Sequence, residues 1–222
     1  MNFNRPLILA SKSPRRQYLM RELGYNFAIQ NPYGDESYDL TMPSEDVPEY
    51  LARKKANSIN QVSDEVLMTS DTVVILSDKI LNKPADKAEA IEMLTQLAGQ
   101  THIVITAVCL KDSHKMLCIK DRTEVTFNKL ERREIEQYVD HFKPFDKAGA
   151  YGAQDCLPKG SQPCSKEELA FLAKLGKGDL VEKTFTDPSV GMGMQAIQKI
   201  KGSYFNVMGL PIHKVYEALE QF

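Results

Sequence analysis

The chain has 222 residues, which is enough for one or two domains with a substantial buried core. Its 42% hydrophobic and 26% charged residues are typical of a globular protein and exclude a disordered or fibrous one. With 28 Lys and Arg against 30 Asp and Glu, the net charge is −2. No overall basic field therefore attracts nucleic acid or an anionic membrane, and any phosphate binding must be local.

Strand-like and helix-like segments alternate along the chain, which favours an α/β or α+β fold. Ser13-Pro14 is typical of a helix start, Ser44 is the expected cap of a second helix, and Asp86 and Glu89 have capping-box spacing. The expected elements of the first half are a strand at 7–10, a helix from 14 to about 24, a strand at 27–30, a helix at 45–62, strands at 65–68 and 72–76, a turn at 77–78 before 80–81, and a helix ending at Gly99.

The second half begins with a predicted hairpin and then departs from this alternation. Expected elements are strands at 101–110 and 116–127, a helix at 131–141, a strand at 196–201 and a helix at 211–222. Residues 155–194 are rich in Gly, Pro, Ser and Lys and look like an excursion from the core, with a helix at 166–175 capped by Ser165. We therefore predict a single domain over 1–222 with an excursion inserted at about 155–194.

The sequence also bears on location and on its cysteines. No run approaches the roughly 20 apolar residues that span a bilayer, and the start lacks an apolar signal region, so we expect a cytoplasmic protein without membrane contacts. The cysteines are expected as free thiols. The alternative is a zinc site built from Cys156, Cys164 and two histidines, but no Cys-x-x-Cys or His-x-x-x-His pair anchors it.

The segment from Ser11 to Arg16 runs from a predicted strand directly into a predicted helix. Free backbone N–H groups at a helix start attract anions, and the Arg15 and Arg16 guanidiniums suit phosphate oxygens. The other interpretation is an ordinary capped surface helix with solvated arginines.

Asp71 and Thr72 precede a run of β-branched residues, and Lys83 follows the next turn. A carboxylate at a strand end can bind Mg²⁺ or orient a water molecule, and Lys83 can neutralise phosphate charge. The simpler interpretation is a strand start with an exposed lysine.

Two further segments carry weaker signals. Gly149 and Gly152 permit close backbone approach, and the amide of Gln154 offers a donor and an acceptor to a nucleobase or phosphate. Taken by itself, however, this segment is better explained as a plain glycine turn. Glu36 follows Asp35 in a polar loop, and acidic pairs in loops are commonplace.

Taken together, these segments resemble the Maf family of nucleotide pyrophosphatases. The resemblance is carried, in family order and spacing, by 7–11 with 13–16, 51–52 with 55–56, 70–74, 83–84, 97–104, 146–154 and 202–211. It implies an elongated α/β fold like that of inosine triphosphate pyrophosphatases, with a mixed twisted sheet and two lobes around a deep cleft.

The resemblance also implies an activity, namely hydrolysis of a nucleoside triphosphate to the monophosphate and pyrophosphate with Mg²⁺ or Mn²⁺. Asp71 is implied as general base or metal-organising carboxylate, with Glu36 helping to hold the ion. The implied triphosphate-binding residues are Ser11, Arg15, Arg16, Lys55 and Lys83. In the subfamily acting on dTTP and UTP, the positions of Arg15, Thr72 and Gln154 carry these same residues and are linked to substrate choice, so dTTP, UTP and modified pyrimidine nucleotides are the expected substrates.

The chain departs from the family after Gln154, where about forty residues intervene before Gly202 in place of a short connection. Members of the family are often homodimers, whereas the sequence itself fixes no oligomeric state. The competing hypothesis is a nucleotide-binding regulator linked to septation that uses the same residues without turnover. Direct nucleic-acid binding is disfavoured by the net charge of −2.

Overall fold

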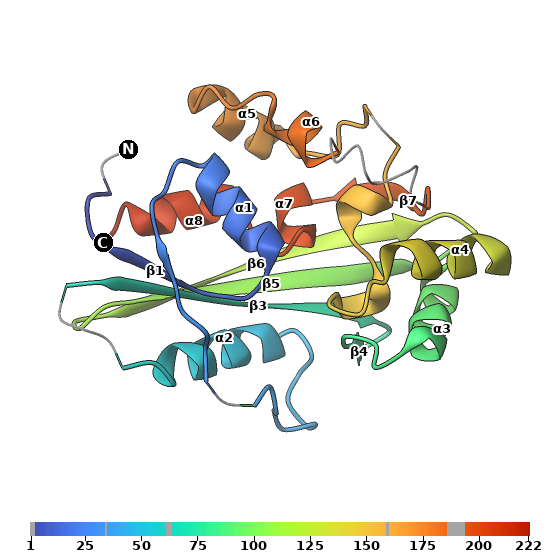
Figure 1. Cartoon of the computed structure of the whole chain (residues 1–222), viewed down its shortest axis with the longest axis horizontal. Helices are drawn as coiled ribbons and strands as arrows, with labels where there is room; N and C mark the ends of the chain where they lie inside the picture. The colour runs from blue at the N-terminus through green and yellow to red at the C-terminus, as the bar shows by residue number, and fades with distance from the viewer. Residues whose placement is uncertain (1–2, 34, 61–63, 159, 186–193) are drawn as a thin grey trace. The chain divides into compact units, whose positions relative to one another are not determined.

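A computed structural model describes residues 3–33, 35–60, 64–158, 160–185 and 194–222 (Figure 1). Strands and helices alternate as the sequence predicts. The strands are β1 (Leu7–Ala10), β2 (Ala28–Ile29), β3 (Val66–Leu76), β4 (Lys79–Leu81), β5 (Thr101–Lys111), β6 (Met116–Phe127) and β7 (Ile197–Lys201). The helices are α1 (Pro14–Glu22), α2 (Val47–Asn57), α3 (Lys87–Leu97), α4 (Arg132–Phe142), α5 (Lys166–Lys174), α6 (Leu180–Thr184), α7 (Tyr204–Val207) and α8 (Ile212–Leu219), with 3-10 turns η1 (Ala148–Ala150) and η2 (Ala153–Asp155).

In the described residues the strands form one seven-stranded mixed sheet in the order β2-β1-β3-β5-β6-β7, with β4 paired to β3. β1 runs parallel to β2 and β3, whereas β4 and β7 are antiparallel to their neighbours. The expected mixed sheet is confirmed.

The chain divides into two compact units. The first contains residues 1–72, 105–121 and 205–222, and the second contains 73–104 and 122–204. β3, β5 and β6 therefore contribute residues to both units.

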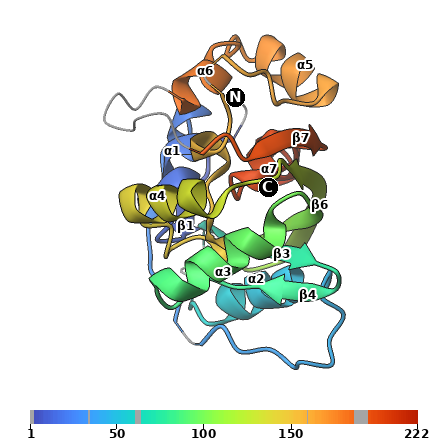
Figure 2. The same cartoon turned by 90° about the vertical axis from the view of Figure 1, so that its right-hand side faces the viewer.

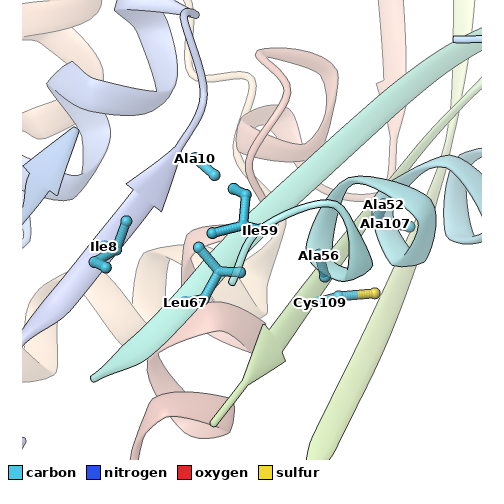
Figure 3. Packing of buried hydrophobic residues seen from close by; sticks show 8 residues of the cluster. All are labelled: Ile8, Ala10, Ala52, Ala56, Ile59, Leu67, Ala107 and Cys109. Atoms are coloured by element: carbon cyan, nitrogen blue, oxygen red, sulfur yellow. The ribbon is translucent and has the colours of Figure 1, made fainter. Parts of the chain in front are cut away.

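The first unit has apolar side chains on both faces of its strands, with α2 on one face and α1 and α8 on the other (Figure 1). Small residues of α2 allow the helix to approach the strands closely. The cluster between α2 and the strands includes residues of both: Ile8, Ala10, Ala52, Ala56, Ile59, Leu67, Ala107 and Cys109 (Figure 3). This packing fixes the helix that carries Lys54 and Lys55.

The predicted start of α2 is wrong by two residues. The helix begins at Val47 after Asp46, not after Ser44. Pro48 explains the difference, because a helix starting at Glu45 would need the Pro48 backbone N–H as a donor, whereas proline is tolerated within the first turn. The helix ends at Asn57, and Val62, its predicted end, lies outside the described residues.

The strands predicted at 65–68 and 72–76 are one continuous strand, β3. Its middle residues Thr69, Ser70 and Asp71 are all buried, which polarity alone did not suggest. The predicted turn at Ser77 and Asp78 is confirmed, with both residues at positive φ. Asp71 therefore lies within a strand and not at its beginning.

The second unit contains α3 and α4, which pack against each other (Figure 2). α5 begins at Lys166 after the predicted cap Ser165, and Ser165 and Glu168 form a capping box. α6 and the 3-10 turns are short elements that the periodicity analysis missed, since fewer than two helical turns leave little pattern.

The expectation of free thiols is wrong for two cysteines. Cys109 and Cys118, on the neighbouring strands β5 and β6, form a disulfide, while Cys156 and Cys164 remain thiols. No group of three or more His, Cys, Asp or Glu residues that could hold a metal ion is found within the described ranges. Over the same ranges, no helix is long and apolar enough to cross a membrane.

Candidate active site

The junction of β1 and α1 is built as the sequence predicts, with Pro14 in the first helical turn after Ser13. Ser11 is buried, and its Oγ accepts a hydrogen bond from the backbone N–H of Ser13 at 3.2 Å. The Ser11 hydroxyl is thereby fixed at the entrance to the helix, while Arg15 is partly exposed on the first turn.

Arg16 uses its guanidinium within the protein. Nε donates to the carbonyl of Gly209 at 2.8 Å, one terminal nitrogen donates to the carbonyl of Ser70 at 3.0 Å and to Ser11 Oγ at 3.4 Å, and the other donates to Thr72 Oγ1 at 2.8 Å. Burial lowers the pKa of Arg16 to about 10, so it stays charged at neutral pH. Arg16 thus forms hydrogen bonds to the residues on both sides of Asp71. The position of Arg16 in the sequence did not reveal this role.

Thr72 continues this network toward the C-terminal segment of the first unit. Its Oγ1 lies 2.9 Å from Thr106 Oγ1, and Thr106 in turn bonds to Asn206 through both its backbone N–H and its hydroxyl, at 3.0 Å each. Sequence reasoning missed Thr106 as a site residue and gave Asn206 no role. Hydroxyls spaced along different strands show no relation until the strands pair.

Three predicted residues meet at the Nζ of Lys55. This ammonium contacts Asp71 Oδ1 in a short ion pair and lies 2.9 Å from Glu36 Oε1. The side chains of Lys55 and Asp71 are 14% and 12% exposed, whereas that of Glu36 is 52% exposed. A mostly buried carboxylate and a more exposed one therefore converge on one cation.

Competing effects act on the carboxyl of Asp71. Burial raises its pKa above the ordinary value, while the charge and hydrogen bond of Lys55 and the charge of Arg16 oppose that shift. An aspartate with a raised pKa is a better proton acceptor than an exposed one.

The carboxylates of Glu36 and Asp71 fit a divalent cation that binds together with phosphate groups. Mg²⁺ is held in proteins by one or two carboxylates together with substrate phosphates and water. Glu36 and Asp71 already point toward a shared cation, the ammonium of Lys55. These two residues fit the predicted metal role, which stays a prediction.

Lys83 and Gln154 belong to the second unit, whereas the other predicted site residues belong to the first. Lys83 is exposed on the segment after β4. Gln154 lies in η2, and its Oε1 is buried without a hydrogen-bond partner among the described residues. An unsatisfied amide oxygen is costly and often indicates a missing ligand or water.

The fold and this cluster place the chain among α/β proteins whose candidate site combines two carboxylates with cationic side chains, an arrangement suited to a phosphorylated ligand and a divalent cation. The family model described as Maf-like protein matches residues 6–159 and 189–222. The chain belongs to the Maf family. Residues 160–188, within the predicted excursion, are left unmatched.

Curated relatives agree with this assignment. A dTTP/UTP pyrophosphatase of Bacteroides fragilis is 38% identical over 218 residues, covering 97% of this chain and 95% of the relative. Proteins of the same name from Flavobacterium psychrophilum (38% over 215 residues, 96% and 92% covered) and Bacteroides thetaiotaomicron (35% over 218 residues, 97% and 95% covered) are also similar.

Proposed function

We propose that this chain is a nucleoside triphosphate pyrophosphatase that hydrolyses dTTP and UTP to the monophosphate and pyrophosphate. The observation that carries the proposal is the convergence of Glu36 and Asp71 on Lys55, in a chain whose near-full-length relatives bear that enzyme name. A pure binding protein has no need of a buried carboxylate held in this way.

The chemistry assigned to the site is attack of a water molecule on the α-phosphorus, with cleavage of the bond to the bridging oxygen. Asp71 orients this water and accepts its proton, and Arg16 keeps Asp71 in place through Ser70 and Thr72. Glu36 and Asp71 would hold Mg²⁺ or Mn²⁺, which offsets phosphate charge when bound. Ser11, Arg15, Lys55 and Lys83 are assigned to the triphosphate.

The free acceptor of Gln154 supports the pyrimidine preference. Thymine and uracil carry an N3–H donor where cytosine carries an acceptor, so Oε1 of Gln154 complements the first two bases and not the third. Satisfying a buried amide oxygen is worth about 1–3 kcal/mol, or roughly tenfold to a hundredfold in discrimination.

Two remaining features belong to the same proposal. A cytoplasmic location is proposed because that compartment supplies the nucleotide substrates. The homodimer implied by the family stays a prediction that light scattering on the purified protein can measure.

A product-resolved substrate screen tests the function. Purified protein is incubated with dTTP, UTP, CTP and GTP plus Mg²⁺ or Mn²⁺, and products are separated chromatographically. We expect monophosphate and pyrophosphate from dTTP and UTP. Release of orthophosphate with a diphosphate would contradict the proposal, as would binding without any turnover, which is the behaviour of a regulatory protein.

A further inference from the structure

The residues on either side of Glu36 are tied to α2 by a lysine that neither the sequence motifs nor the proposed mechanism uses. Lys54 Nζ donates to Asp35 Oδ1 at 2.6 Å, to the carbonyl of Ser37 at 2.9 Å and to Ser37 Oγ at 3.0 Å. Glu36 stands between these two residues in the sequence, so one ammonium contacts both of its neighbours.

Consecutive lysines of one helix thus reach consecutive residues of one loop. Lys54 contacts Asp35 and Ser37, and Lys55 contacts Glu36. Upstream of Asp35, the backbone N–H of Tyr33 donates to Oγ of Ser58, the residue that follows α2. Because α2 is packed on the core through Ala52 and Ala56, the helix gives these contacts a rigid base.

The geometry points to a positioning role rather than a generic surface ion pair. A single exposed pair contributes about 0–1 kcal/mol and restrains little. Lys54 donates three hydrogen bonds to the two residues that flank Glu36, and its side chain is only 33% exposed.

Glu36 needs such support because it is exposed by about half and has a flexible side chain. We propose that Lys54 is a positioning residue that holds the Asp35–Ser37 segment so that the Glu36 carboxylate faces Lys55 and Asp71. This inference rests on the proposed function of Glu36 as a cation ligand. Groups that orient the ligands of a metal commonly change its affinity by about 10–100-fold when removed.

The direct test measures cation binding without turnover. Mn²⁺ is titrated calorimetrically into protein saturated with the α,β-methylene analogue of dTTP, which resists cleavage at the reacting bond. Lys54→Met keeps the aliphatic stem and removes the charge, and we expect it to weaken Mn²⁺ binding about tenfold. Lys54→Arg is expected to recover part of the loss, because guanidinium can donate to the same oxygens.

Arg53→Met is the matched control. Arg53 is the preceding residue of the same helix, is similarly long and charged, and pairs with Glu49 at 2.9 Å instead of the Glu36 loop. We expect this variant to bind Mn²⁺ like the wild type. Equal affinities for Lys54→Met and Arg53→Met would overturn the inference.

A double-mutant cycle separates positioning from a general structural effect. If Lys54 acts through Glu36, Lys54→Met has no further effect on Mn²⁺ affinity once Glu36→Gln is present. The same loss in both backgrounds would contradict the role. Should Lys54→Met fail to fold by circular dichroism, Asp35→Asn weakens the contact from the loop side and is expected to shift Mn²⁺ affinity in the same direction.

The two proposals fail in distinguishable ways. A wild-type protein that releases no pyrophosphate from any nucleotide refutes the proposed function. A wild-type enzyme that is active, with Lys54→Met unchanged in Mn²⁺ affinity and in the metal concentration for half-maximal rate, refutes only the positioning role.

Discussion

Lys55 is the residue on which the candidate site depends. Its ammonium pairs with both the mostly buried Asp71 and the partly exposed Glu36. Removal of this ammonium would leave the Asp71 carboxylate without its ion-pair partner. Breaking a buried pair in this way typically costs about 3–5 kcal/mol. The arrangement therefore restrains the two carboxylates in the free protein, before any ligand binds.

Asp71→Asn tests the assignment of the reacting carboxylate. The amide keeps the shape of the side chain but cannot accept a proton from water, so we expect turnover of dTTP to fall by about 10²–10⁴-fold with the circular dichroism spectrum unchanged. Asp78→Asn, in the exposed turn after the same strand, serves as control and should retain full activity. A fully active Asp71→Asn enzyme would remove Asp71 from the mechanism.

At the scale of elements, the β5–β6 hairpin is closed by the carboxylate of Asp112. Its Oδ1 accepts from the backbone N–H groups of His114 and Lys115 at 2.8 Å each, and its Oδ2 accepts from Arg5 at 2.8 Å. Burial alone would raise the pKa of Asp112, but the hydrogen bonds from Arg5, His114 and Lys115 prevail and lower it from 3.8 to about 2.

This shift predicts how the stability of the hairpin depends on pH. A carboxyl with a lowered folded-state pKa stabilises the fold above its unfolded value and loses that contribution as pH falls from about 4 to 2. Asp112→Asn should therefore reduce the free energy of unfolding by about 2 kcal/mol at pH 7, with the difference from wild type shrinking below about pH 4 and vanishing only below about pH 2. Urea unfolding at several pH values measures this, and a pH-independent difference would contradict it.

The α5 helix of the unmatched segment is joined to the rest of the second unit by a buried carboxylate. Glu168 accepts hydrogen bonds from Ser203 Oγ at 2.5 Å and from the backbone N–H groups of Tyr204 and Ser165 at 3.0 Å each. Ser203 and Tyr204 lie in the family-matched part of the chain, so Glu168 bonds α5 to that part of its own unit.

Removal of this carboxylate should destabilise the protein. Glu168→Ala leaves three donors without their acceptor, and we expect a loss of about 3 kcal/mol in the free energy of unfolding. Glu167→Ala, at an exposed position of the same helical turn, should change it by less than about 0.5 kcal/mol. Similar unfolding curves for the two variants would show that the segment is only loosely attached.

On the scale of the whole molecule, a net charge of −2 conceals strong local charge. Within the first unit, Arg16 and Lys55 act on Asp71 while Glu36 opposes them. Such a balance keeps the outer surface unattractive to polyanions while leaving local cations for one phosphorylated ligand.

Ligand binding should therefore stabilise the whole protein. At a concentration of about 100 times its Kd, the α,β-methylene analogue of dTTP with Mn²⁺ is expected to add about 2.7 kcal/mol. For a chain of this length that corresponds to a rise in Tm of roughly 5–10 °C, measurable by calorimetry. The matching CTP analogue, added at the same concentration, should give a smaller rise in Tm. Equal rises would contradict the role of Gln154 in base choice.

Local sequence signals determined most elements of this protein. Pro14 and Ser165 mark helix starts through their own local chemistry, and two β-type segments joined by the polar turn at 111–114 predict the hairpin without reference to distant residues. The same reasoning misplaced the start of α2 because it gave Ser44 more weight than Pro48. It also divided β3, because it read buried polar residues as a break between strands.

The candidate site was only partly accessible from the sequence. The family resemblance implied roles for Glu36, Lys55 and Asp71, but their meeting at one ammonium appears only in the folded chain. The same holds for the four hydrogen bonds of Arg16 and for the contacts of Lys54 with the residues that flank Glu36. The physical reason is distance along the sequence: helix caps and turns are decided by neighbouring residues, whereas these contacts join segments that become neighbours only when the strands pair and α2 packs on them. The near-zero net charge argues only against a general affinity for polyanions, whereas the tertiary structure decides where the individual charges act.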